Sequence, residues 1–290
     1  MLLIDASVYI FRAYHALPSS ITGDDGRPVN AIHGYATFLV QLLAGAEDDR
    51  VAAAFDESLV SSFRNELYAD YKATRELPPA DLEAQIAGCR ALTEALGVAT
   101  LSSPVYEADD LIGTLAVDAD EPVTIVTSDK DLAQLLGEGD TLWDYAREIR
   151  YDAAAIRARF GVGPRAIPDY LALVGDTVDN IPGVPGIGAK TAAALLGCFE
   201  DLEAMLVDID AVAESGVRGA RSLAGRLETH ADQARLSRRL ATIVTDIDLS
   251  AAERRIERRP VDAEQLRAVC DRLGLGQGLR RKLGLDEASE

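Results

Sequence analysis

The stretch LLIDASVYIFRAYHAL, residues 2–17, joins a short apolar run to a helix-like aromatic segment through Asp5. Short apolar runs recur along the first half of the chain, and stretches with helical periodicity separate them. This alternation predicts an α/β fold with a parallel-rich central sheet between helices through about residue 165. The other expected strands are VAAAFD (51–56), VATLSS (98–103), PVTIVTSD (122–129) and DTLWDY (140–145).

Carboxylates gather at the ends of these runs and at the starts of the segments that follow. The carboxyl ends of parallel strands meet at one edge of a sheet, so we expect these side chains to lie together. A single Asp after a strand is as often only a helix cap, but a group of them would repel and raise each other's pKa unless cations bind there. The sequence therefore predicts a multi-metal site formed by Asp5, Asp56, Glu107, Asp109, Asp110, Asp129, Asp131, Asp176 and Asp179.

Other acids provide an internal comparison for this prediction. Asp118, Asp120 and Glu121 precede the strand expected at 122–129, so they should lie at the opposite edge of the sheet. We expect these three side chains to be ordinary solvated surface.

The ligand types indicate the metal and the chemistry. Carboxylates without His or Cys favour the hard cations Mg²⁺ or Mn²⁺ over Zn²⁺. Two such ions about 3.5–4 Å apart activate water and stabilise a leaving oxygen, which predicts phosphate-ester hydrolysis. A haloacid-dehalogenase-like phosphatase needs D-x-D-x-T at the end of its first strand. Here that strand ends in Asp5-Ala6-Ser7, so this alternative is rejected.

The overall composition gives a mixed indication of the partner. The net charge of −19, from 29 basic and 48 acidic residues, argues by itself against nucleic acid. Part of that acidity lies in the predicted site, however, where metal ions would neutralise it. The three cysteines are far apart and fit buried thiols in a reducing compartment. With no apolar run of membrane-spanning length, we expect a soluble, cytoplasmic protein without membrane contact.

The second half is mainly helical and carries a Gly-rich turn, IPGVPGIGAKTAAALL. Gly186 and Gly188 let backbone amides approach a phosphate, Lys190 adds charge, and Thr191 lies at the start of the next helix, whose N-terminus attracts anions. This pattern predicts a helix–hairpin–helix that grips the duplex backbone without reading sequence. Other basic residues expected on this face are Arg218, Arg221, Arg226, Arg235, Arg238 and Arg239.

The order and spacing of these motifs resemble the 5′-nuclease family, which comprises flap endonucleases and the 5′→3′ exonuclease domain of bacterial DNA polymerase I. The similarity runs from LLIDASVYIFRAYHA through YKATR, EADDLIGTLA, TSDKDLAQL and GDTVDNIPGVPGIGAKTA to RLATIVTDIDL. No polymerase domain follows residue 290, so the resemblance predicts a stand-alone homologue or an excised domain.

The resemblance implies roles for particular residues. Asp5, Asp56, Glu107, Asp109 and Asp110 would bind one metal ion, and Asp129, Asp131, Asp176 and Asp179 the second. Lys72 and Arg75 in YKATR match arch residues that contact the scissile phosphate, where a cation offsets developing charge. Arg64 would assist, Tyr71 or Tyr14 would stack on an unpaired base, and the hairpin would bind K⁺ through backbone carbonyls.

Three parts are expected in the chain. Residues 1–165 would form the metal-binding nuclease core, with an exposed helical arch around 60–80. Residues 166–260 would form the DNA-binding region, and 261–290 a C-terminal helix and a fraying tail.

We predict a structure-specific 5′-nuclease that acts as a monomer on DNA with a 5′ flap or 5′ end at a duplex junction, with an RNA primer strand as a further substrate. Two alternatives stay open: a DNA-junction binding protein without catalysis, and a PIN-like ribonuclease. The sequence does not predict the balance of endo- and exonuclease activity. It also does not predict which acids contact a metal ion directly and which do so through water.

Overall fold

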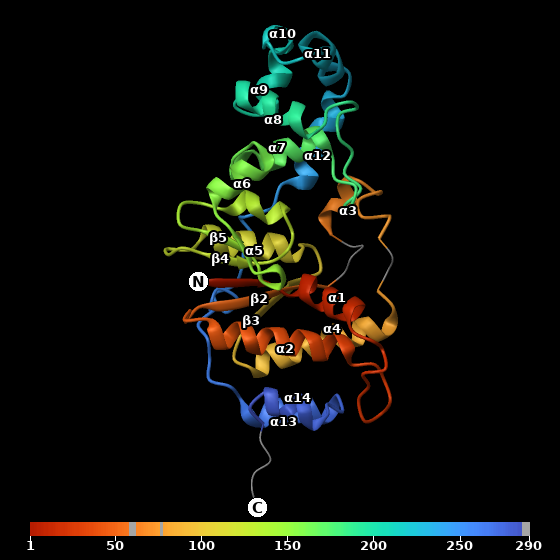
Figure 1. Cartoon of the computed structure of the whole chain (residues 1–290), viewed down its shortest axis with the longest axis vertical. Helices are drawn as coiled ribbons and strands as arrows, with labels where there is room; N and C mark the ends of the chain where they lie inside the picture. The colour runs from red at the N-terminus through yellow and green to blue at the C-terminus, as the bar shows by residue number, and fades with distance from the viewer. Residues whose placement is uncertain (58–61, 76–77, 286–290) are drawn as a thin grey trace, which may run out of the picture.

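A central sheet organises the first half of the computed structural model, which describes residues 1–57, 62–75 and 78–285 (Figure 1). Among these residues the sheet has six strands in the order β3-β2-β1-β4-β5-β6. Its first five strands are parallel, which confirms the predicted class, and the last is an antiparallel edge strand that was not predicted. They are β1 (Leu2–Asp5), β2 (Val51–Asp56), β3 (Ala99–Ser103), β4 (Thr124–Val126), β5 (Thr141–Asp144) and β6 (Ile149–Tyr151).

The strand order places a topological switch point beside β1. The chain moves from β1 outward to β2 and β3, then crosses back to β4 on the other side of β1. Leu2 is the register partner of both Val51 and Thr124, so the three central strands start level with one another. Ligands of open α/β sheets bind at the carboxyl ends of strands at such a point.

Side chains alternate between the two faces of the sheet, as the strand period requires. Leu3 of β1 packs in one apolar cluster, whereas Leu2 and Ile4 pack in the other. The first cluster includes helix α5 (Ala108–Val117), and the second is covered by α1 (Ala6–Ala16), α2 (Asn30–Gly45) and α4 (Ala80–Ala95). Helices therefore cover both faces, as the sequence predicted.

The second half forms a helical region at the top of Figure 1. Its apolar side chains continue the cluster on the α5 face of the sheet, so the two halves share one core. The elements after β5 are η2 (Tyr145–Arg147), α6 (Ala153–Phe160), η3 (Pro164–Ala166), α7 (Ile167–Val174), α8 (Ala189–Cys198), α9 (Leu202–Val207), α10 (Ile209–Glu214), α11 (Ala220–Thr229) and α12 (Ala231–Ala241).

The C-terminal helices lie at the far end of the molecule, beside α2 and α4 (Figure 1). An extended segment leads to α13 (Ala263–Arg272) and α14 (Gln277–Lys282) past the sheet, where Val51 N donates to Ile256 O at 2.8 Å. Leu279 and Leu283 of the expected tail LRRKLGLDEASE (279–290) are buried in the second apolar cluster, so the prediction of fraying was wrong for residues 279–285. Residues 286–290 of that tail lie outside the described residues. In the part of the chain that the structure describes, no helix is both long and apolar enough to cross a membrane.

Candidate metal and nucleic-acid site

A cavity of about 250 Å³ opens at the carboxyl edge of the central strands. Five of the nine predicted acids line it, each delivered by a strand end or by the start of the following helix. Two cations predicted to contact the phosphate also line it. The charged lining residues are Asp5, Asp56, Glu107, Asp109, Asp129, Lys72 and Arg75.

Asp5 ends β1 and is fixed by two hydrogen bonds. Its Oδ1 accepts from Val8 N at 3.3 Å and caps α1, and its Oδ2 accepts from Thr127 Oγ1 at 2.8 Å. The side chain is almost entirely buried. Burial, followed by the charge of Asp56, raises the pKa of Asp5 from 3.8 to about 7. A nearby cation would relieve this unfavourable charge.

Asp56, at the end of β2, connects the strand edge to α5. Its backbone N donates to Ser7 Oγ at 3.0 Å, and its Oδ1 accepts from Ala108 N at 2.9 Å. The first turn of α5 is thereby held against β2, which places the following Asp109 at the cavity. Burial, and then the charge of Asp129, raises the pKa of Asp109 well above its ordinary value.

Asp129 and Asp131 lie in the turn after β4, where η1 (Asp131–Leu135) begins. Asp129 Oδ1 accepts from Asp131 N at 2.9 Å. Burial raises the pKa of both carboxyls, and for Asp131 the charge of Asp129 is the next cause. Asp131 Oδ1 is buried and has no hydrogen-bond partner in the part of the chain that the structure describes. Buried, uncompensated carboxylate oxygens are the donors that a hard divalent cation takes, so these residues fit such an ion.

The carboxyl groups lie close to one another, but they are not arranged as the ligands of a single ion. Within residues 1–57, 62–75 and 78–285, no three of the acidic, His or Cys side chains stand at the spacing of ligands to a single ion. Like charges explain this separation, since neighbouring carboxylates repel.

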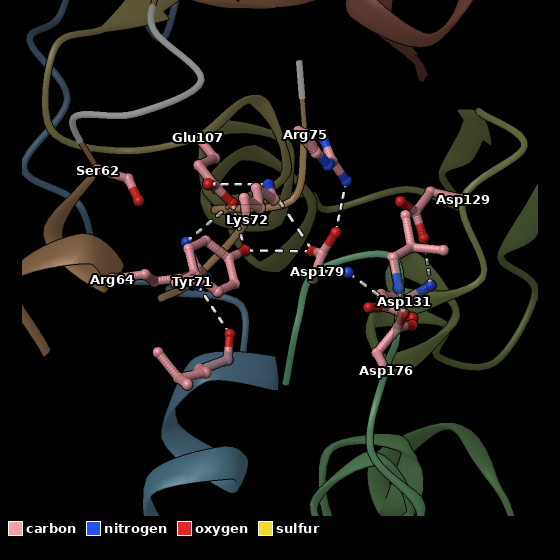
Figure 2. A network of polar contacts seen from close by, with 12 residues as sticks. Ser62, Arg64, Tyr71, Lys72, Arg75, Glu107, Asp129, Asp131, Asp176 and Asp179 are labelled. Carbon is pink, nitrogen blue, oxygen red and sulfur yellow. Dashed lines mark hydrogen bonds and ion pairs between the residues drawn. The ribbon is translucent and has the colours of Figure 1, made fainter. Parts of the chain in front are cut away.

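Two other acids are paired with the predicted catalytic cations (Figure 2). Lys72 Nζ lies 2.9 Å from Glu107 Oε1, and Arg75 Nη2 lies 2.5 Å from Asp179 Oδ1. Tyr71 OH joins the pairs by donating to Glu107 at 3.1 Å and to Asp179 at 3.3 Å. Burial alone would raise the pKa of Glu107, but the positive charges, Lys72 first, outweigh it and lower the pKa.

Two side chains predicted to contact DNA are buried in the protein alone. Arg64 is only 2% exposed and donates to both carboxyl oxygens of Asp110, at 2.7 Å each, and to the carbonyl of Leu240 at 2.9 Å. Tyr71 is 3% exposed because its ring lies inside the network of Figure 2. Neither side chain reaches a DNA strand in this arrangement. Tyr14, the other aromatic candidate, is half-buried and donates to Asp81 at 3.2 Å.

Asp110 has a different role from the one that the resemblance implies. It is fully buried, and besides Arg64 its oxygens accept from Glu107 N at 3.1 Å and Val244 N at 2.8 Å. The structure makes Asp110 the counter-ion that holds Arg64 and fixes the start of α5.

Where the structure describes it, the expected arch around 60–80 has little helix and is only partly exposed. It contains helix α3 (Phe63–Leu67), followed by turns through residue 75. Lys72 has a left-handed backbone, with φ of 54°, and is 9% exposed. Residues 58–61 and 76–77 of the expected arch lie outside the described residues.

The acids predicted at the opposite edge are there. Asp120 Oδ1 pairs with Arg50 at 2.8 Å, and Glu121 lies 3.6 Å from the Met1 amino group. Asp118, Asp120 and Glu121 are solvent-accessible, which confirms the comparison drawn from the sequence.

The Gly-rich turn lies between α7 and α8, as a helix–hairpin–helix requires. Gly186 has a φ of 77°, and a side chain there would collide with the guanidinium of Arg226. Gly188 is the N-cap of α8 and a Cβ there would meet open space, while Lys190 is exposed and Thr191 half-buried beside it. The turn therefore presents an accessible helix N-terminus next to a lysine.

The other basic residues of this half divide into two sets. Arg218 and Arg221 are exposed on the surface at the start of α11. Arg235 instead pairs with Glu203 at 2.6 Å, and Arg238 pairs with Asp169 at 2.9 Å. Ion pairs therefore engage part of the basic face predicted from the sequence.

Comparison with protein families decides the relationship. Residues 1–161 match the family described as 5′-3′ exonuclease, N-terminal resolvase-like domain, and residues 162–264 match 5′-3′ exonuclease, C-terminal SAM fold. The chain belongs to the 5′-3′ exonuclease family.

Some relatives of this 5′-3′ exonuclease family member are similar to it in length, and others are much longer. The 5′-3′ exonuclease of Buchnera aphidicola is 36% identical over 262 residues, which cover 89% of this chain and 86% of that protein. DNA polymerase I of Pseudomonas aeruginosa is 45% identical over 253 residues, covering 86% of this chain but 28% of the polymerase. The match therefore spans less than a third of that polymerase.

Solved structures share the fold at low identity. The T5 D15 protein co-crystallized with metal ions has a TM-score of 0.67 at 17% identity, with 98% of each chain covered. The catalytic core of Rad2 in complex with DNA substrate has a TM-score of 0.65 at 17% identity, covering 98% of this chain and 92% of that one.

One charged residue of this exonuclease-family site was not singled out from the sequence. Lys130 Nζ lies 2.5 Å from Asp176 Oδ2, and Asp176 Oδ1 accepts from Val178 N at 2.7 Å. The signal was present in TSDKD, where a lysine stands between two acids at a strand end.

Proposed function

We propose that this protein is a structure-specific 5′-nuclease that hydrolyses phosphodiesters of DNA near a single-strand/duplex junction with two Mg²⁺ or Mn²⁺ ions. One observation carries the proposal: four carboxyl groups that form no ion pair among the described residues line the same cavity as Lys72 and Arg75. Family membership supports the reaction, and the likeness in fold to nucleases supports the architecture.

We assign the acids to the two ions by their positions in the metal-free protein. Asp5, Asp109 and Asp129 would hold the first ion, with Asp56 and Glu107 at the rim of the same cavity. Asp131, Asp176 and Asp179 would hold the second. When bound, such ions activate the attacking water and stabilise the leaving oxygen.

Lys72 and Arg75 would provide positive charge for the phosphate. Each now pairs with an acid, Lys72 with Glu107 and Arg75 with Asp179. Metal ions that neutralise these acids would release both cations toward a phosphate, where charge develops during hydrolysis.

The hairpin would hold duplex DNA while the 5′ flap or 5′ end enters the cavity. The exposed Lys190 and the N-terminus of α8 suit the phosphate backbone. An RNA primer strand is a further substrate under this proposal, and a monomer suffices. A K⁺ ion bound by the backbone carbonyls of the turn would share them with hydrogen-bond donors of the protein. Pro182 O and Gly183 O already accept hydrogen bonds from the side chains of Ser237 and Gln233.

A cleavage assay on 5′-labelled flap, nicked-duplex and single-stranded DNA tests the proposal. With Mg²⁺ we expect cutting near the junction, and with EDTA none. Asp109→Asn should lower the rate at least about a hundredfold, because it removes a carboxylate from the metal group. Duplex binding in EDTA should persist. Asp120→Asn, at the opposite edge, is the matched control and should cleave like the wild type.

The outcomes separate the alternatives. Unchanged cleavage by Asp109→Asn would show that the site is wrongly assigned. Junction binding without cleavage in Mg²⁺ or Mn²⁺ would favour the binding-protein alternative. A strong preference for single-stranded RNA would favour the ribonuclease.

A further inference from the structure

Lys130 lies among the acids assigned to the second ion, and it rests directly on one of them. Its Nζ is 2.5 Å from Asp176 Oδ2. The Asp176 side chain is 4% exposed, whereas that of Lys130 is 40% exposed. The ammonium thus covers a buried carboxylate from the solvent side.

One oxygen of the carboxyl beside this pair has no hydrogen-bond partner among the described residues. Asp131 Oδ1 is buried without a hydrogen bond, and it follows Lys130 directly in the chain. Figure 2 shows Asp131 and Asp176 next to each other. The charges of Asp131, Asp176 and Asp129 all stabilise the Lys130 ammonium. The single positive charge of Lys130 therefore offsets the charges of three carboxylates.

The backbone at Lys130 is fixed, but its side chain is not enclosed. Asp129 N donates to Thr127 Oγ1 at 2.9 Å, Asp131 N donates to Asp129 Oδ1 at 2.9 Å, and Ala133 N donates to Lys130 O at 3.1 Å. The four-carbon stem can therefore move the ammonium away from Asp176 without any change in the main chain.

The acids of the first group lack this arrangement. Lys130 is not among the residues that line the cavity of Asp5, Asp109 and Asp129. The cations that line that cavity, Lys72 and Arg75, pair with Glu107 and Asp179. An ion at Asp176 must instead displace an ammonium that rests directly on its own ligand.

We propose that the Lys130 ammonium is a resident counter-cation of the second metal site, which holds Asp176 in place and must leave it before a divalent ion can bind. This proposal rests on the proposed function. It assigns Lys130 as a positioning residue, and it predicts that the two ions bind in order, with the Asp5 group filled first. A DNA phosphate near the site would favour the second ion by offering the ammonium another anion.

The test measures Mn²⁺ binding to the DNA-free protein by calorimetry and by electron paramagnetic resonance. The wild type should bind one ion more tightly than the other. Lys130→Met keeps the length of the stem and removes the charge, so it should tighten the weaker site at least about fivefold, the lower range of coupling between sites. Lys130→Arg should restore weak binding. Lys282→Met, on α14, is the matched control and should bind like the wild type.

The outcomes distinguish failure of the Lys130 proposal from failure of the proposed function. A folded Lys130→Met protein whose second site is unchanged or weaker overturns the role of Lys130 while leaving the metal site intact. A wild-type protein that binds no Mn²⁺ at millimolar concentration overturns both this role and the proposed function. The circular-dichroism spectrum and urea midpoint of Lys130→Met in EDTA establish that the variant is folded.

Discussion

Replacing Asp5 by Asn should disable the enzyme and yet stabilise the metal-free fold. Burial raises the pKa of Asp5 from 3.8 to about 7, so the folded state binds this proton more tightly than the unfolded state. Stability is therefore lost as pH rises from about 4 through about 7. Each pKa unit corresponds to about 1.4 kcal/mol, which places the full penalty at about 4 kcal/mol above pH 7.

Asn removes the charge with little other change. It is as good a helix cap as Asp, so the contact with Val8 N at the start of α1 can persist. Without metal, we expect Asp5→Asn to be more stable than the wild type by about 2–4 kcal/mol at pH 8, and by less than about 1 kcal/mol at pH 4.5. Urea unfolding in EDTA at the two pH values measures this difference.

The control carries the same substitution at an exposed cap. Asp152 caps α6 by accepting from Ala155 N at 2.7 Å and is exposed, so Asp152→Asn should change stability by no more than about 0.5 kcal/mol at either pH. The reasoning would be refuted if Asp5→Asn destabilised the protein at pH 8, or changed its stability equally at both pH values.

Two further variants test other parts of the fold and site. Arg64→Met leaves the buried Asp110 carboxylate without its bidentate partner and should lower the free energy of unfolding by about 3–5 kcal/mol in urea titrations; a loss below about 1 kcal/mol would contradict a structural role. Gly186→Ala adds a side chain at a positive φ and should weaken duplex binding in fluorescence anisotropy, whereas Gly197→Ala, where a Cβ meets open space, should bind like the wild type. Equal affinities of the two variants for duplex DNA would show that the hairpin turn is not part of the DNA-binding surface.

The sequence predicted the parts of the fold that depend on local pattern. The five parallel strands followed from apolar runs. The convergence of Asp5, Asp109 and Asp129 followed from their positions after strands or at the start of the next helix. The exposed three-residue strand β6 gave no such signal. The individual metal and catalytic roles came from the family resemblance, not from spacing.

Contacts between distant segments could not be predicted in this way. We expected Arg64 to reach DNA from the surface, because its partner, Asp110, lies 46 positions away and only the fold brings the two together. The same applies to Tyr71, which is buried by Glu107 and Asp179. Leu279 and Leu283 are four residues apart, a helical spacing, but their place at the end of the chain favoured a fraying tail.

Anomalous diffraction from crystals soaked in Mn²⁺ tests most directly whether the acids at the sheet edge form two metal sites. The account predicts two peaks at this edge of the sheet. One should be bound by Asp5, Asp109 and Asp129, and the other by Asp131 and Asp176, with the Lys130 side chain turned away. Peaks only at other acids, such as Asp120 at the opposite edge, or no peak at millimolar Mn²⁺, would contradict it.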